Sequence, residues 1–136
     1  MRIQKFLLAT VAVGVAVNIY DYVLHGMLLQ GPLYSQLTGF MRADASVPLL
    51  VLSDFVAALV FVWVYDRVQS AFPPGPKGGA VFGLYAAVLI GFPTWIGCYL
   101  LIAGFTYGLA WAWTFAGLGW GLIAGAIAGL LYRARA

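Results

Sequence analysis

The sequence predicts an all-α integral membrane protein, a four-transmembrane-helix bundle with both termini on the cytoplasmic side. Composition, four long apolar stretches and a one-sided distribution of basic residues lead to this prediction. Of the 136 residues, 64% are hydrophobic and only 8% are charged, and the mean hydropathy is +0.98. Soluble domains carry about 25% charged residues, so lipid must cover much of this surface. We expect residues 1–136 to form a single transmembrane domain.

Four stretches are long enough to cross a bilayer, which takes about 20 mainly apolar residues. They cover approximately residues 5–29, 47–65, 79–101 and 109–132. The prolines and glycines of residues 70–78 rule out a continuous helix there. The longer connection 30–46 leaves room for a short interfacial helix over about residues 33–41.

The basic residues indicate the orientation of these spans. Only Arg42 falls on the far side of the four-span arrangement. All the others share one side, which the positive-inside rule makes cytoplasmic: Arg2, Lys5, Arg67, Lys77, Arg133 and Arg135. We therefore expect a multi-pass protein of the bacterial inner membrane. A cleaved signal peptide is the alternative for the N-terminus, but apolarity continues past Ala16 to spanning length.

Polar residues inside the first and second spans predict a buried polar cluster. Asn18, Asp21 and His25 follow helical spacing, and an ionisable group at mid-bilayer costs about 2.5–3.5 kcal/mol. We expect their stripe to face protein, and with it four further residues of the first span: Leu7, Val11, Gly14 and Leu28. Asp54 should lie at the depth of Asp21, and Arg42 is long enough to reach down from the loop.

Two interpretations of the cluster Asn18, Asp21, His25, Asp54 and Arg42 remain open. Two carboxylates with a histidine can share protons, which favours proton or cation handling. The same groups can also fix helix packing through interhelical hydrogen bonds. His25 is the only candidate histidine ligand for a metal. No metal-ligand spacing is present, and no cofactor is firmly implied.

Glycines at every fourth position give the last span a smooth face. The repeat consists of Gly117, Gly121, Gly125 and Gly129, and such a pattern permits close approach of another helix. Its partner is the first span, a second copy of the chain or another protein. Two deeper tryptophans, Trp95 and Trp120, are compatible with a lipid, quinone or pigment pocket.

Three functions follow from these features. The leading hypothesis is an accessory or helix-packing subunit of a membrane complex, with the lipid bilayer and other membrane helices, in a homo-oligomer or a larger assembly, as partners. The second is a small proton- or cation-handling transporter that uses the Asp/His cluster. The third is a binder of a lipid, quinone or pigment. The scattered basic residues do not indicate nucleic-acid binding, and an enzyme is the least supported class because no nucleotide-binding motif occurs.

Several short motifs resemble those of a group of small bacterial four-span membrane proteins. They are Leu24-His25-Gly26-Met27-Leu28-Leu29 with Tyr34 downstream, Met41-Arg42, Tyr65-Asp66-Arg67, Phe82-Gly83, Tyr99, Trp113 and Gly129-Leu130-Leu131-Tyr132-Arg133. The resemblance covers most of the chain. It implies the four-span architecture, includes a His-Gly-x-Leu-Leu element at the end of the first span, and draws attention to His25.

Overall fold

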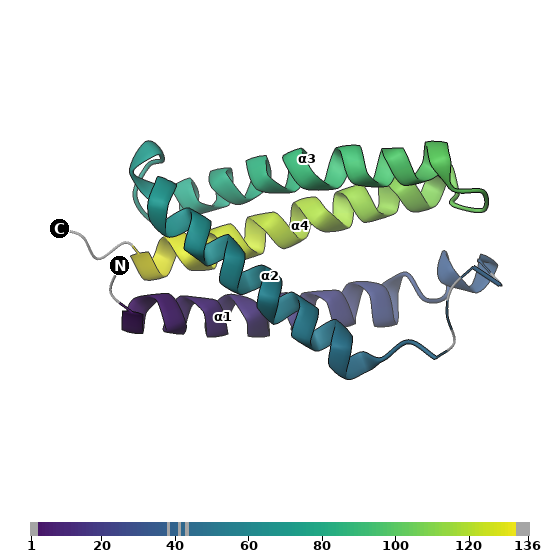
Figure 1. Cartoon of the computed structure of the whole chain (residues 1–136), viewed down its shortest axis with the longest axis horizontal. Coiled ribbons are helices and arrows are strands. Elements are labelled where there is room, and N and C mark those ends of the chain that lie inside the picture. The colour runs from purple at the N-terminus through teal and green to yellow at the C-terminus, as the bar shows by residue number, and fades with distance from the viewer. Residues whose placement is uncertain (1–2, 38, 41, 43, 133–136) are drawn as a thin grey trace.

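The computed structural model describes residues 3–37, 39, 40, 42 and 44–132, and within them the protein is all-α (Figure 1). Helix α1 covers Ile3–Asp21 and continues as a π-helical segment, Tyr22–Leu28. Helices α2, α3 and α4 cover Val47–Val68, Pro76–Leu101 and Tyr107–Tyr132. Four helical stretches are long and apolar enough to cross a membrane.

The helices end where local chemistry stops them, a few residues away from the predicted bounds. Helix α2 runs three residues beyond Tyr65, because nothing before Pro73-Pro74 breaks it. Helix α3 begins at Pro76 rather than residue 79, since proline fits the first helical turn. Helix α4 begins at Tyr107 because the Thr106 hydroxyl accepts the Leu109 N–H at 3.1 Å and caps the helix.

Helix α1 buries a different face from the one that the polar stripe predicts. Leu7 and Val11 are 53% and 55% exposed, and Leu28 is 60% exposed. The buried side chains are instead Phe6, Ala9, Thr10, Val13 and Val17, with Gly14 beside them. The prediction is wrong for Leu7, Val11 and Leu28, whereas Gly14 is buried as predicted. Apolar residues occur on every side of α1, so the polar residues alone do not define which face packs.

Helices α3 and α4 form an antiparallel hairpin whose backbones touch near one end of the bundle. A Cβ added to Gly125 would overlap the carbonyl oxygen of Gly79, and one on Gly83 would overlap that of Gly121. A Cβ on Gly79 would lie 2.8 Å from Gly129 Cα. The backbones therefore touch, and both helices supply glycines to the contact.

The two ends of the bundle differ in character. Lys5, Arg67 and Lys77 lie at the end where α1 and α3 begin and α2 ends (Figure 1), here called the basic end. The core there joins α1, α2, α3 and α4 through residues such as Val13, Val62, Phe82 and Ala124. Toward the other end α2 diverges from the α3–α4 hairpin, and its first ten residues are mostly exposed (Figure 1).

The connection between α1 and α2 folds back onto the other end of the hairpin, here called the aromatic end. Tyr34 and Leu37 are each 8% exposed and pack with Phe105, Leu109 and Ala110. Within the possible interfacial helix, the structure shows only a single 3₁₀ turn, Tyr34–Gln36. Residues 38, 41 and 43 of the connection lie outside the described part.

Candidate functional site

Asp21 and His25 form the centre of the candidate site, one helical turn apart on α1. His25 Nε2 lies 3.9 Å from Asp21 Oδ1, and the two side chains are 33% and 28% exposed. At that separation the two groups form a loose ion pair when His25 is protonated. They are close enough for a small shift to turn the contact into a hydrogen bond.

A π-helical segment carries His25. Residues 22–28 have the wider π-helical winding, and the Leu29 N–H donates to the Leu24 carbonyl at 2.8 Å in the five-residue pattern of a π-helix. Such segments are rare and occur frequently at functional sites. None of the seven residues is buried, so packing of this segment does not account for its conformation.

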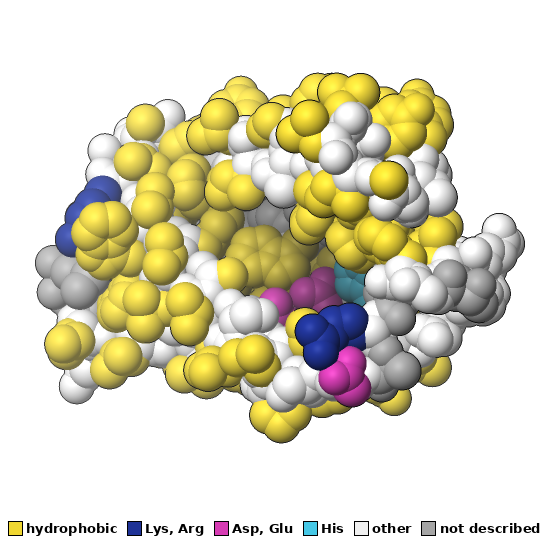
Figure 2. Space-filling model, turned by 45° about the vertical axis from the view of Figure 1, so that its right-hand side comes forward, with side chains coloured by type: hydrophobic (Ala, Val, Ile, Leu, Met, Phe, Trp, Pro, Cys, Tyr) yellow, Lys and Arg dark blue, Asp and Glu magenta, His cyan; other side chains and the backbone are white. Residues whose placement is uncertain are grey.

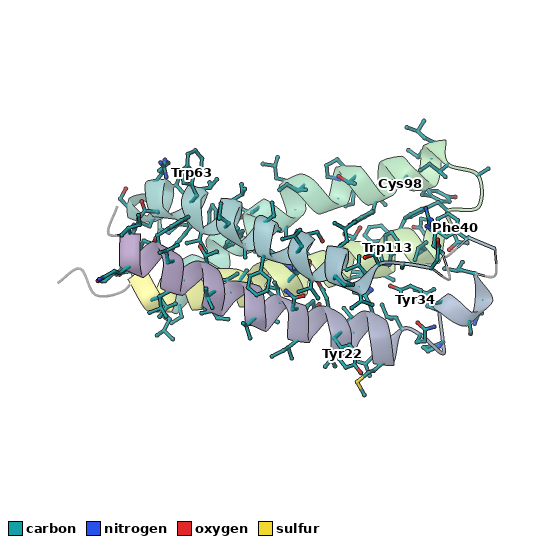
Figure 3. The ribbon with its side chains drawn as sticks, turned by 60° about the horizontal axis from the view of Figure 1, so that its bottom comes forward. Tyr22, Tyr34, Phe40, Trp63, Cys98 and Trp113 are labelled. Atoms are coloured by element: carbon teal, nitrogen blue, oxygen red, sulfur yellow. The ribbon has the colours of Figure 1, made fainter. Side chains whose placement is uncertain are left out.

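Tyr34 and Trp113 extend the site across two further elements. The hydroxyl of Tyr34 is hydrogen-bonded to His25 Nδ1, and the two rings are parallel within 4°. The indole Nε1–H of Trp113, on α4, donates to the same hydroxyl at 2.8 Å. Figure 3 shows Tyr34 and Trp113 near each other at the aromatic end, whereas Tyr22 points outward. A chain of contacts therefore links α4, the 30–46 connection and α1.

Asp54 adds a second carboxylate from α2. It is partly buried, and it lies near enough to Asp21 for the two carboxylates to repel each other when both are ionised. Figure 2 shows a hollow on this face, with acidic side chains and the histidine at its floor and hydrophobic side chains around them. Because α2 diverges from the hairpin, the hollow opens to the side of the bundle (Figures 1 and 2).

The side chains of Asn18 and Arg42 make their hydrogen bonds outside this group. Asn18 Nδ2 donates to the Gly14 carbonyl of its own helix at 2.8 Å. Arg42 makes two hydrogen bonds to Asp44, at 3.0 and 2.9 Å, and both side chains are largely exposed. Of the five residues predicted to cluster, Asp21 and His25 lie side by side, and Asp54 lies within electrostatic range of Asp21.

Two titratable groups near the aromatic end, Tyr34 and Asp44, have pKa values shifted by their neighbours. Burial raises the pKa of Tyr34 above its usual value, and the Trp113 hydrogen bond acts in the opposite direction with a smaller effect. Tyr34 is therefore a neutral phenol at neutral pH and can donate its hydroxyl proton. The Arg42 guanidinium holds the pKa of Asp44 below its usual value.

The glycine repeat of α4 has two kinds of environment. Gly121, Gly125 and Gly129 contact α3 of the same chain, whereas a Cβ on Gly117 would meet nothing within 4 Å. The glycine prediction did not include the matching glycines on α3 and just before it. Their signal was visible, because Gly75, Gly79 and Gly83 also recur at every fourth position.

Tyr34 and Trp113 were the site residues that pattern reasoning did not identify. Both residues stood only among the motifs of the resemblance, and no sequence spacing joins them. Their contact spans 79 positions of the chain, which no local spacing can indicate. Among the described residues, no group of three or more His, Cys, Asp or Glu side chains is arranged to hold a metal ion.

The two tryptophans proposed to line a ligand pocket pack against other aromatic side chains instead. Trp95 lies against Trp113 with ring centroids 4.8 Å apart, and Trp120 meets Phe61 at 5.6 Å. Separately, a cavity of about 280 Å³ lies at the basic end, lined in part by Tyr65, Gln69 and Tyr132. It is remote from the Asp/His group, because its lining residues lie where α2 and α4 end, whereas Asp21 and His25 lie at the far end of α1.

Comparison with protein-family models, with curated proteins and with solved structures finds no match to this chain.

Proposed function

We propose that the chain is a multi-pass protein of the bacterial inner membrane, with both termini in the cytoplasm, whose Asp21–His25–Asp54 group takes up and releases a proton. The placement in the membrane is supported by four apolar helices and by basic side chains at one end. A proton-handling role agrees with the general finding that ionisable residues inside membrane spans mark proton or ion pathways.

The observation that carries the proposal is the bonding state of the two carboxylates. Among the described residues, neither Asp21 nor Asp54 pairs with a lysine or arginine, and neither accepts a hydrogen bond from another helix. A structural role in packing needs such interhelical bonds. Two carboxylates in apolar surroundings, without a lysine or arginine partner, must instead be neutralised by a proton, by His25 or by a bound cation.

The accessory-subunit hypothesis remains a prediction with less support than before. The main support for this hypothesis was the glycine face of α4, which could receive a helix of another protein. Three of the four glycines of that face contact α3 of the same chain. A partner protein would therefore have to use a different surface, such as the exposed first half of α2.

Proton flux in liposomes tests the proposal. Purified protein is reconstituted with a pH-sensitive dye inside, and an imposed potassium diffusion potential drives protons inward. We expect wild type to acidify the interior faster than protein-free liposomes do. Asp21→Asn and Asp54→Asn should each abolish this difference, because an amide cannot exchange the proton.

Asp66→Asn is the matched control, because Asp66 is an aspartate of the same chain placed in the last turn of α2 at the basic end. It should leave the flux at the wild-type level. Equal rates for wild type and protein-free liposomes would contradict the proposal. If a monovalent cation competes for the carboxylates, its addition should lower the proton flux in wild type.

A further inference from the structure

The imidazole of His25 has a partner at each nitrogen. Nδ1 is hydrogen-bonded to the Tyr34 hydroxyl, and Nε2 faces Asp21 Oδ1 at 3.9 Å. A neutral imidazole carries its proton on only one nitrogen, and the hydrogen bond made by the other nitrogen decides which. The partner of Nδ1 therefore determines what His25 presents to Asp21.

The series of hydrogen bonds from Trp113 through Tyr34 to His25 has one direction that uses every donor. An indole N–H can only donate, so the Tyr34 oxygen is an acceptor toward Trp113, at 2.8 Å. Tyr34 then has one proton left, its own, and His25 Nδ1 is the acceptor within reach. A neutral His25 that accepts this proton at Nδ1 has its hydrogen on Nε2, on the side of Asp21.

We infer that Trp113, acting through Tyr34, is a positioning residue that fixes the tautomer of His25 with its N–H directed at Asp21. This inference rests on the proposed function, since it explains how Asp21 receives a donor from His25. With the other tautomer, the lone pair of Nε2 would face the carboxylate, and His25 would have no proton to give it.

The surroundings hold both positioning side chains in place. Trp113 packs against Trp95 and Phe105, with ring centroids 4.8 and 5.4 Å apart. Tyr34 is 8% exposed, and its ring lies parallel to that of His25. The packing restricts both rings to one orientation, so the indole N–H and the phenol remain aligned.

Nitrogen-15 NMR of labelled histidine tests the inference directly, because the chain contains a single histidine. Protein in lipid nanodiscs, at a pH where His25 is neutral, should show an Nε2–H tautomer with a hydrogen-bonded Nδ1. In Tyr34→Phe this single-tautomer pattern should be lost. Trp113→Phe keeps an aromatic ring but removes the N–H, and should shift the Nδ1 resonance in the same direction by a smaller amount.

Trp111→Phe is the matched control, because Trp111 lies on the same helix but packs against Phe92 and Phe115. It should leave both imidazole resonances unchanged. An Nδ1–H tautomer in wild type would overturn the inference. So would a Trp113→Phe protein that keeps the wild-type resonances.

A second measurement tests the role of Trp113 if the Trp113→Phe protein does not fold. The indole N–H resonance of Trp113 should move in Tyr34→Phe, and an unmoved resonance would overturn its role. Proton flux measured on the same samples separates the two claims. A fixed Nε2–H tautomer in a protein without flux supports the positioning role and contradicts only the proposed function.

Discussion

At the scale of single residues, the distribution of charge explains why Asp21 and Asp54 are unusual. Lys5, Arg67 and Lys77 lie at the basic end, and Arg42 is held by Asp44. The described cations are therefore either far from the hollow or already paired. His25 is left as the titratable base nearest to Asp21. The net charge around the hollow therefore depends on how many protons Asp21, His25 and Asp54 carry.

Arg42→Gln tests the separation of the loop ion pair from the site. Without the guanidinium, the pKa of Asp44 should rise toward its usual value, since Arg42 is the main cause of its depression. A depressed carboxyl pKa stabilises the fold above the unfolded value and loses that effect as the pH falls through the folded pKa. Because both side chains are largely exposed, we expect little change in stability.

Carbon-13 NMR of the carboxyl groups measures this outcome, since all four acidic residues of the chain are aspartates. Only the titration of Asp44 should move in Arg42→Gln. A shift in the titration of Asp21 or Asp54 would mean that Arg42 does take part in the cluster.

At the scale of helices, contact between α3 and α4 changes in kind along their length. Glycines bring the backbones together near the basic end. Toward the aromatic end the contact is made by large rings, such as Phe92 with Trp111 and Tyr99 with Tyr107, at 5.9 and 5.4 Å. The two helices therefore need to be closer at one end than at the other.

Two glycine substitutions in the same repeat should differ in their effect on stability. Gly125→Ala places a methyl group against the Gly79 carbonyl, where backbone cannot easily move. It should lower the free energy of unfolding by about 1–3 kcal/mol. Gly117→Ala meets open space and should be neutral, or stabilising by up to about 1 kcal/mol through helix propensity.

Unfolding in detergent, followed by circular dichroism, measures both variants under identical conditions. Each carries the same chemical change on the same helix, so each serves as the control for the other. Equal destabilisation by the two substitutions would argue against the glycine contact between α3 and α4.

The helices, Asp21, His25 and Asp54 could be predicted from the sequence, whereas the roles of Tyr34 and Trp113 could not. Apolar length identifies α2, and the four-residue glycine spacing identifies a packing face on α4, because both signals are local. Which face of α1 is buried depends on partners such as Phe55, whose ring lies against Gly14. The Trp113–Tyr34 hydrogen bond likewise depends on how the 30–46 connection folds back onto α4, and local sequence spacing does not predict that.

At the scale of the whole molecule, α1 and α3 begin, and α2 and α4 end, at the basic end (Figure 1). For a protein in the inner membrane, this end should face the cytoplasm. The aromatic end, with Arg42 and the 30–46 connection, should then face the periplasm. The opening of the hollow would lie at the lipid side of the bundle.

Cysteine labelling in intact cells tests this orientation. In a Cys98→Ser background, the chain has no other cysteine, so Lys77→Cys and Ser35→Cys each provide one target. A membrane-impermeant maleimide should label Ser35→Cys in intact cells and Lys77→Cys only after the membrane is opened. The reverse pattern would invert the proposed topology.

The glycine contact at the basic end has a consequence for how the protein meets its lipid. With α3 and α4 touching at one end and α2 splayed away at the other, the molecule occupies unequal areas in the two leaflets (Figure 1). Lateral pressure in the wider leaflet then acts on the angle of α2. We expect cone-shaped lipids to change that pressure, so that bilayer curvature and the width of the hollow become mechanically linked.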